Sequence, residues 1–149
     1  MQMRPSTLPL ALAILLSGSL IAACSPAPEA PAATYQGTMA SGCAPHDAPS
    51  TELQLESTDG ASSVWFNLWP TDGIVPPTTV EFDSQHTIGQ GLYCTAPEDC
   101  EPAAWGRVAL EGPGGSGGVE GEWTLGLANG LLYRGRFTAD WLAIQALCG

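Results

Sequence analysis

The feature that most restricts the fold of this 149-residue chain is a two-residue hydrophobic period, which starts near Tyr35 and persists through most of the remaining sequence. Such alternation is typical of strands with one buried face, and no long stretch follows the 3.6-residue period of a helix. In segment 63–69, for example, one face carries Val64, Phe66 and Leu68. We therefore expect one all-β domain of about seven or eight antiparallel strands, forming a sandwich or a small barrel.

Turn residues divide this pattern into short segments. Thr58-Asp59-Gly60 predicts a turn, the prolines within 70–77 predict a loop, and the glycine-rich run 112–118 predicts a hairpin tip. The non-alternating segment 140–147 predicts a short terminal helix. The expected strands lie within residues 51–56, 63–69, 80–82, 89–94, 105–111, 119–127 and 131–138.

The last two strands predict a hairpin with a defined register. A two-residue Asn129-Gly130 turn would place Trp123 opposite Arg136 and mix the two faces. A three-residue loop, Ala128-Asn129-Gly130, with the glycine in the left-handed conformation keeps the faces separate. That register pairs two aromatic residues with strand glycines, Trp123 with Gly135 and Phe137 with Gly121, so that each ring covers a glycine.

The first 24 residues contain one charge, Arg4, followed by an apolar run from Leu8 to Leu16 and the sequence Ile21-Ala22-Ala23-Cys24. This order is typical of a secretory signal, and the apolar run is too short to span a bilayer stably. The final four residues resemble the lipobox of bacterial lipoprotein precursors. The resemblance implies removal of residues 1–23 and lipidation of Cys24. An aspartate directly after the cysteine would resemble an inner-membrane retention signal. Ser25 stands there instead, so the resemblance favours the outer membrane of the cell envelope over the inner membrane.

Residues 24–34 follow as the lipidated cysteine and a Pro/Ala-rich tether, which would reach about 30 Å in a polyproline conformation. The β domain is expected over 35–149. The predicted mature chain keeps all fifteen acidic residues and three arginines, a formal charge of −12, one below the −11 of the whole chain because Arg4 is lost. This charge repels phosphate backbones, so nucleic acid is not an expected partner.

Four further cysteines remain after the predicted lipidation site, and an even number in an exported chain indicates disulfides. We expect Cys94–Cys100 to close a short loop and Cys43–Cys148 to join the two ends of the domain. A zinc site is the alternative, but zinc sites usually place two cysteines close together in each half of the site, and Cys43 and Cys148 stand alone.

Trp65 and Trp69 are the candidate binding residues, because both lie on the face of segment 63–69 opposite the expected core. The alternative is that this strand is covered on both faces, for instance by the proline-rich loop. A ligand or protein contact on this face would mark the domain as a recognition module.

No motif of a hydrolase, metalloprotease, EF-hand or phosphate-binding loop is present, so we expect no catalytic residues, cofactor or metal site. His46 with Asp47, or His86 with Asp83, could form a surface metal site, but exposed loop histidines are the simpler interpretation. The carboxylates Glu120 and Glu122, and those of segment 98–101, are interpreted as solvated clusters rather than calcium ligands.

The sequence therefore predicts a membrane-anchored envelope lipoprotein with a non-enzymatic binding or structural role. Its partners would be the membrane, through Cys24, and an envelope protein or small ligand. Two alternatives remain. A barrel carrying an apolar ligand would need a cavity lined by Val64, Phe66, Leu68, Trp123 and Tyr133. An inhibitor of a cationic enzyme such as lysozyme is suggested by the acidic charge alone.

Overall fold

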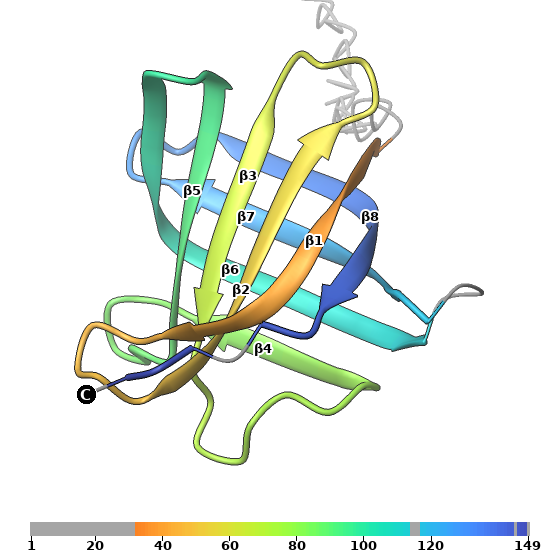
Figure 1. The fold of residues 1–149 in the computed structure, drawn as a ribbon. Coiled ribbons are helices and arrows are strands. Elements are labelled where there is room, and N and C mark those ends of the chain that lie inside the picture. Colours follow the sequence, from red (N-terminus) through yellow and green to blue (C-terminus); the bar gives the residue numbers. More distant parts are fainter. Residues whose placement is uncertain (1–31, 114–116, 145, 149) are drawn as a thin grey trace, which may run out of the picture. The chain divides into compact units, whose positions relative to one another are not determined.

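The computed structural model describes residues 32–113, 117–144 and 146–148, which form a β-barrel (Figure 1). Its strands are β1 (Ala33–Cys43), β2 (Pro49–Ser57), β3 (Ser63–Leu68), β4 (Thr78–Phe82), β5 (Gly89–Ala96), β6 (Asp99–Pro113), β7 (Val119–Leu127) and β8 (Leu132–Leu142). Among the described residues there is no helix long and apolar enough to cross a membrane. The signal peptide, Cys24 and most of the tether lie outside the described residues.

Seven strands close the barrel, in the order β6-β5-β3-β2-β1-β8-β7 and back to β6. In Figure 1, β1, β2, β3 and β5 cross steeply in front of β6, β7 and β8. Neighbours around the ring are antiparallel except β1 and β8, which are parallel. The all-antiparallel expectation was wrong at this seam. When strands alternate in direction and their number is odd, the first and last strands run the same way, so closure requires one parallel pair.

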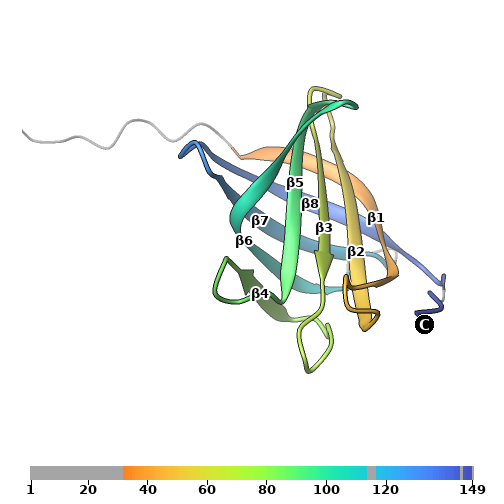
Figure 2. The same ribbon diagram turned by 90° about the vertical axis from the view of Figure 1, so that its left-hand side faces the viewer.

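The eighth strand, β4, lies outside the ring. It pairs with β6 alone, and β6 is long enough to pair with two strands along the same edge. β5 pairs with the first part of β6, ending at Pro102, and β4 pairs from Gly106 to Leu110. Figure 2 shows β4 beside the lower part of β6, separated from β5 by a turn. The barrel wall is therefore interrupted between β4 and β5.

Side chains fill the barrel interior. The largest fully buried residues are Trp123, Phe66, Met39, Leu53, Leu68, Leu125, Val64, Val80 and Val108. The predicted inward face of β3 is confirmed, because Val64, Phe66 and Leu68 are each at most 2% exposed. β4 also contributes to this core through Val80 and Phe82, although it does not belong to the ring.

The predicted β7–β8 hairpin is confirmed, including its register. Trp123 pairs with Gly135 and Gly121 pairs with Phe137. Gly130 has a φ of 86°, and the Leu127 N–H donates to the Leu131 carbonyl at 2.9 Å, which closes the three-residue loop. The Phe137 ring covers Gly121 as expected.

The expected cover of Gly135 was wrong. The ring nearest to Gly135 is that of Tyr35 on β1, whose carbons would lie 2.6 Å from an added Cβ. Trp123 instead meets Tyr35 edge-on, with 5.0 Å between ring centroids. The parallel seam brings β1 alongside β8, so a ring from the other neighbouring strand fills the space above the glycine.

Both predicted disulfides are present, Cys43–Cys148 and Cys94–Cys100. The second joins directly paired residues of the β5–β6 hairpin, so segment 98–101 lies at a strand start rather than in a longer loop. The first joins the end of β1 to the segment that follows β8.

The predicted helix over 140–147 was wrong. β8 continues to Leu142, and the described residues beyond it are not helical. Asp140, Trp141 and Leu142 pair in parallel with Thr38, Met39 and Ala40. Pairing with β1 therefore overrides the local lack of alternation. β1, over Ala33–Cys43, was not among the expected strands, and it begins two residues before Tyr35.

Candidate functional site

The interruption between β4 and β5 opens into a cleft of about 440 Å³ on the outer side of the barrel. The segment 83–88 follows β4 after Phe82 and rejoins the sheet at Gly89, where β5 begins. This segment forms one side of the cleft, and the outward side chains of β6 form the other. Its lining residues are Glu81, Phe82, Asp83, His86, Ile88, Trp105, Gly106 and Arg107.

The floor of the cleft is apolar and depends on glycine. Phe82 turns into the barrel and meets Phe66 edge-on, with 6.5 Å between ring centroids. A Cβ on Gly106 would lie 2.3 Å from Phe82 Cζ, so only glycine leaves room for this ring. Ile88, partly buried, packs against the same core. The Phe82 ring therefore fills the opening that the missing strand pairing leaves.

Trp105 forms one wall of the cleft. It lies on the outward face of β6, next to a register shift between Ala103 and Trp105. Bulges of this kind redirect a side chain, and here the indole lies over Gly126, its partner on β7. A Cβ on Gly126 would lie 2.1 Å from Trp105 Nε1. The indole is nevertheless 42% exposed, so its surface away from β7 remains accessible.

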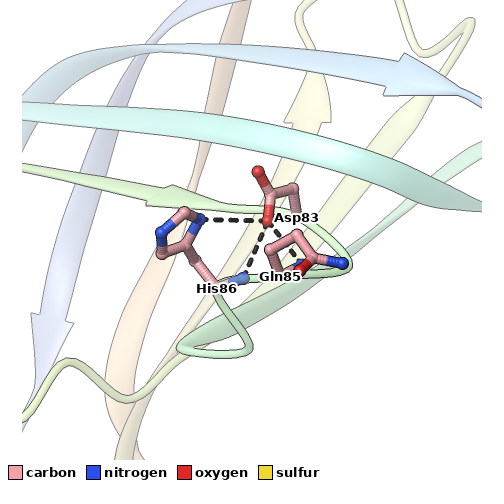
Figure 3. A network of polar contacts seen from close by, with 3 residues as sticks. All are labelled: Asp83, Gln85 and His86. Atoms are coloured by element: carbon pink, nitrogen blue, oxygen red, sulfur yellow. Dashed lines mark hydrogen bonds and ion pairs between the residues drawn. The ribbon is translucent and has the colours of Figure 1, made fainter.

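Two pairs of polar side chains border this indole. Glu81 and Arg107 are direct partners on β4 and β6, and Arg107 Nε lies 3.3 Å from Glu81 Oε1. In the turn after β4, His86 Nδ1 lies 3.2 Å from Asp83 Oδ1 (Figure 3). All four side chains are substantially exposed to solvent.

Asp83 organises the turn after β4. Its Oδ1 accepts hydrogen bonds from the backbone N–H groups of His86 and Gln85, each at 2.7 Å (Figure 3). The bond from the His86 N–H, followed by that from Gln85, lowers the pKa of Asp83 below its usual value. The carboxylate is therefore ionised at neutral pH and fixes the orientation of His86 beside the cleft.

This arrangement is suited to binding. His86 and Asp83 are both substantially exposed to solvent at the edge of the cleft. Within the described part of the chain, no three His, Cys, Asp or Glu residues gather as a metal site would require. The cleft instead offers an exposed aromatic surface with hydrogen-bonding groups around it.

Trp65 and Trp69, the binding residues predicted from the sequence, have different neighbours. Trp65 is half-buried on the outer wall of β3, beside β2 and β1. Trp69 lies beyond the end of β3, where its Nε1 donates to the Thr87 carbonyl at 2.7 Å and its ring meets His46. Asn67, between them, is buried and donates to the Cys43 carbonyl. Their binding role stays a prediction.

The other residues considered from the sequence do not form a shared site. His46 and His86 lie in different loops, and Glu120 and Glu122 point to solvent as expected. The proposed lining of an apolar-ligand cavity is packed against itself, since Phe66 and Trp123 have ring centroids 6.1 Å apart. Tyr133 stacks on Tyr93 with 3.8 Å between centroids. This packing gives no support to a carrier function.

Trp105 is the site residue that sequence reasoning missed. The signal was present, because alternation in 105–111 that turns Val108 and Leu110 inward also turns Trp105 and Arg107 outward. What the sequence could not show was the neighbouring turn 83–86. Comparison with known proteins gave no match: no family model, curated protein or solved structure matches the chain.

Proposed function

We propose that this protein is a lipid-anchored lipoprotein of the bacterial envelope and acts as a non-enzymatic binding module, with the cleft beside Trp105 as its binding surface. The observation that carries the proposal is the exposure of Trp105 on the outside of a barrel whose interior is filled. Large aromatic side chains held rigidly beside a concavity are typical contact residues.

The proposed location in the cell envelope rests on the residues from Arg4 to Cys24 and on the two disulfides. Disulfides form and persist in oxidising compartments such as the periplasm and cell surface. Cys43–Cys148 also ties the C-terminal segment to β1, which restricts the unfolded chain of a small domain. A filled barrel gives a rigid support for an external site.

The anchoring part is tested by expressing the full chain in a diderm bacterium and measuring its mass and membrane association. We expect the mature chain to begin at Cys24, to carry acyl groups and to sediment with membranes. Cys24→Ala should release the chain into the soluble fraction. A soluble wild-type chain of unmodified mass would contradict the proposed anchor.

The binding part is tested by capture from envelope extract with three forms of the chain: wild type, Trp105→Ala and Trp65→Ala/Trp69→Ala. We expect capture to be lost in Trp105→Ala and retained in the double variant, with near-UV circular dichroism confirming that each form folds. Loss in the double variant alone would move the site to the face predicted from sequence. Capture of a basic protein that disappears at high salt in all forms would favour the inhibitor alternative.

A further inference from the structure

Trp105 presents a flat aromatic surface at the edge of the cleft. The indole lies against β7 at Gly126, next to the bulge in β6. The accessible part of the ring is flat and fixed, at the edge of a cleft of about 440 Å³. This volume falls in the range of about 300–1,000 Å³ that small-ligand pockets occupy. A flat apolar ligand face would therefore bind without reordering the protein.

The groups around the indole are planar and rich in hydrogen-bonding capacity. In the Glu81–Arg107 pair the contact joins Nε to Oε1, and the guanidinium carries further N–H donors while the carboxylate has a second oxygen, on two side chains that are substantially exposed. Asp83 uses Oδ1 for its turn contacts, so Oδ2 lies outside them. Donors and acceptors therefore lie side by side around an aromatic surface, and hydroxyl groups match this arrangement because each can donate and accept.

The charge of the protein restricts the class of ligand further. The chain carries a formal net charge of −11, which disfavours anionic ligands such as phosphorylated or sulfated molecules. Within the cleft the Glu81 carboxylate is paired with Arg107. A cationic ligand would have to compete with this guanidinium, whereas a neutral ligand would not.

We propose that the cleft binds a neutral saccharide whose sugar rings have the gluco configuration. Such rings carry their hydroxyl groups equatorially, so their axial C–H groups form a flat apolar face that stacks on Trp105. The equatorial hydroxyl groups then reach Glu81, Arg107 and Asp83 at the rim. The inference deepens the proposed function, on which it rests, by assigning the ligand class of the same cleft.

The test uses the purified full chain, with chitotetraose and cellotetraose as probes. Binding is measured by calorimetry and by the indole Nε1–H resonances of the five tryptophans. Trp105→Phe identifies the Trp105 resonance by its loss. We expect this resonance to shift on titration with either probe. Trp105→Ala should weaken affinity about tenfold or more, as loss of a stacking surface does elsewhere. Trp105→Phe should retain most of the affinity, and Trp65→Ala should match wild type.

Two further variants separate stacking from hydrogen bonding. Glu81→Gln keeps the shape of the side chain but removes its charge, and we expect a smaller loss of affinity than in Trp105→Ala. Wild-type affinity in Trp105→Ala, or no binding of either probe at 10 mM, roughly the weakest affinity of interest, would overturn the saccharide inference. If Trp105-dependent capture of an envelope protein persisted in that case, the proposed binding function would stand and only its ligand class would fail. Absence of both would reject the proposed function as well.

Discussion

The two edges of β6 are treated differently. Along one edge, β7 pairs from Ala103 to Pro113, with two register shifts that the wall absorbs. Along the other edge, β5 pairs only as far as Pro102, and β4 resumes at Gly106 after a turn. The β7 edge is a continuous wall, and the β4/β5 edge is a split wall.

The difference shows where a small filled barrel can place a binding site. In the continuous wall, each side chain either enters the core or lies among its cross-strand neighbours, as Glu120 and Glu122 do. In the split wall, the chain leaves the sheet and places Asp83 and His86 beside the outward face of β6. Phe82 keeps the interior closed at the same point. The interruption therefore creates an external cleft without opening the core.

The largest expected effect concerns the two disulfides, which stabilise the barrel unequally. Cys43–Cys148 closes the seam between β1 and β8 across a separation of 105 residues, whereas Cys94–Cys100 spans 6 residues beside the split. In the chain-entropy model the long bridge contributes roughly 4–5 kcal/mol and the short one roughly 2–3 kcal/mol to the free energy of unfolding. We expect Cys43→Ser/Cys148→Ser to lose correspondingly more than Cys94→Ser/Cys100→Ser in urea denaturation.

Equal losses in the two double variants would contradict this ranking. Treatment of the wild type with reductant supplies the control, because its unfolding free energy should fall by about the sum of both effects. A change in the denaturant slope would show instead that the unfolded ensemble had become more compact or expanded.

A second, smaller contrast compares two phenylalanines whose rings meet edge-on, Phe66 in the closed ring and Phe82 on β4 outside it. Phe66 on β3 is 0% exposed and Phe82 on β4 is 5% exposed. Truncation of a buried phenylalanine costs about 3–5 kcal/mol, and the cost is lower where the surroundings can relax. We expect Phe66→Ala to lie near the upper end and Phe82→Ala near the lower end, measured by urea denaturation.

Hydrogen exchange sharpens the same contrast. Phe82→Ala should speed amide exchange in β4 and in the turn 83–88 more than in β7 and β8. Phe66→Ala should instead speed exchange around the whole ring, because β3 belongs to the closed barrel. Uniform acceleration in both variants would show that the split wall is not a separate unit.

The smallest expected effects are changes in stability with pH, one at alkaline pH through Tyr35 and one at acidic pH through Asp83. Burial raises the pKa of Tyr35 above its usual 10.0, opposed only in part by its hydrogen bond of 2.8 Å to Ser62. Its contribution to stability is complete below pH 10.0 and is lost as the pH rises through the raised pKa. Tyr35→Phe should remove this alkaline dependence and cost about 1 kcal/mol at neutral pH.

In the split wall, the lowered pKa of Asp83 has the reverse consequence. The stability that the ionised Asp83 side chain contributes is present above the usual pKa of 3.8. It is lost as the pH falls through the lowered pKa. We expect the amide shifts of Gln85 and His86 to follow this titration while the barrel stays folded across it. Asp83→Asn should abolish this pH dependence of the Gln85 and His86 amide shifts. A global unfolding transition at the same pH would contradict a local role.

The sequence predicted most of the local structure because nearby residues determine it. The β7–β8 register followed from keeping Trp123 and Phe137 off the polar face, and Gly130 supplied the conformation that the loop needs. Of the three possible disulfide pairings, the expected one is present: the short spacing favoured Cys94–Cys100, and Cys43–Cys148 is the remaining pair. The terminal helix and the cover of Gly135 failed for a common reason, since both depend on β1, which pairs with β8 although about a hundred residues separate them in the chain.

By itself, the sequence determined the fold class, the inward face of β3 and the geometry of the last hairpin. These depend on alternation, spacing and turn chemistry, which act over a few residues. The tertiary structure alone decided for a barrel over a sandwich, the parallel seam and the cleft. Those features depend on the number of strands in the ring and on two segments sharing one edge of β6, which arise only when distant parts of the chain meet.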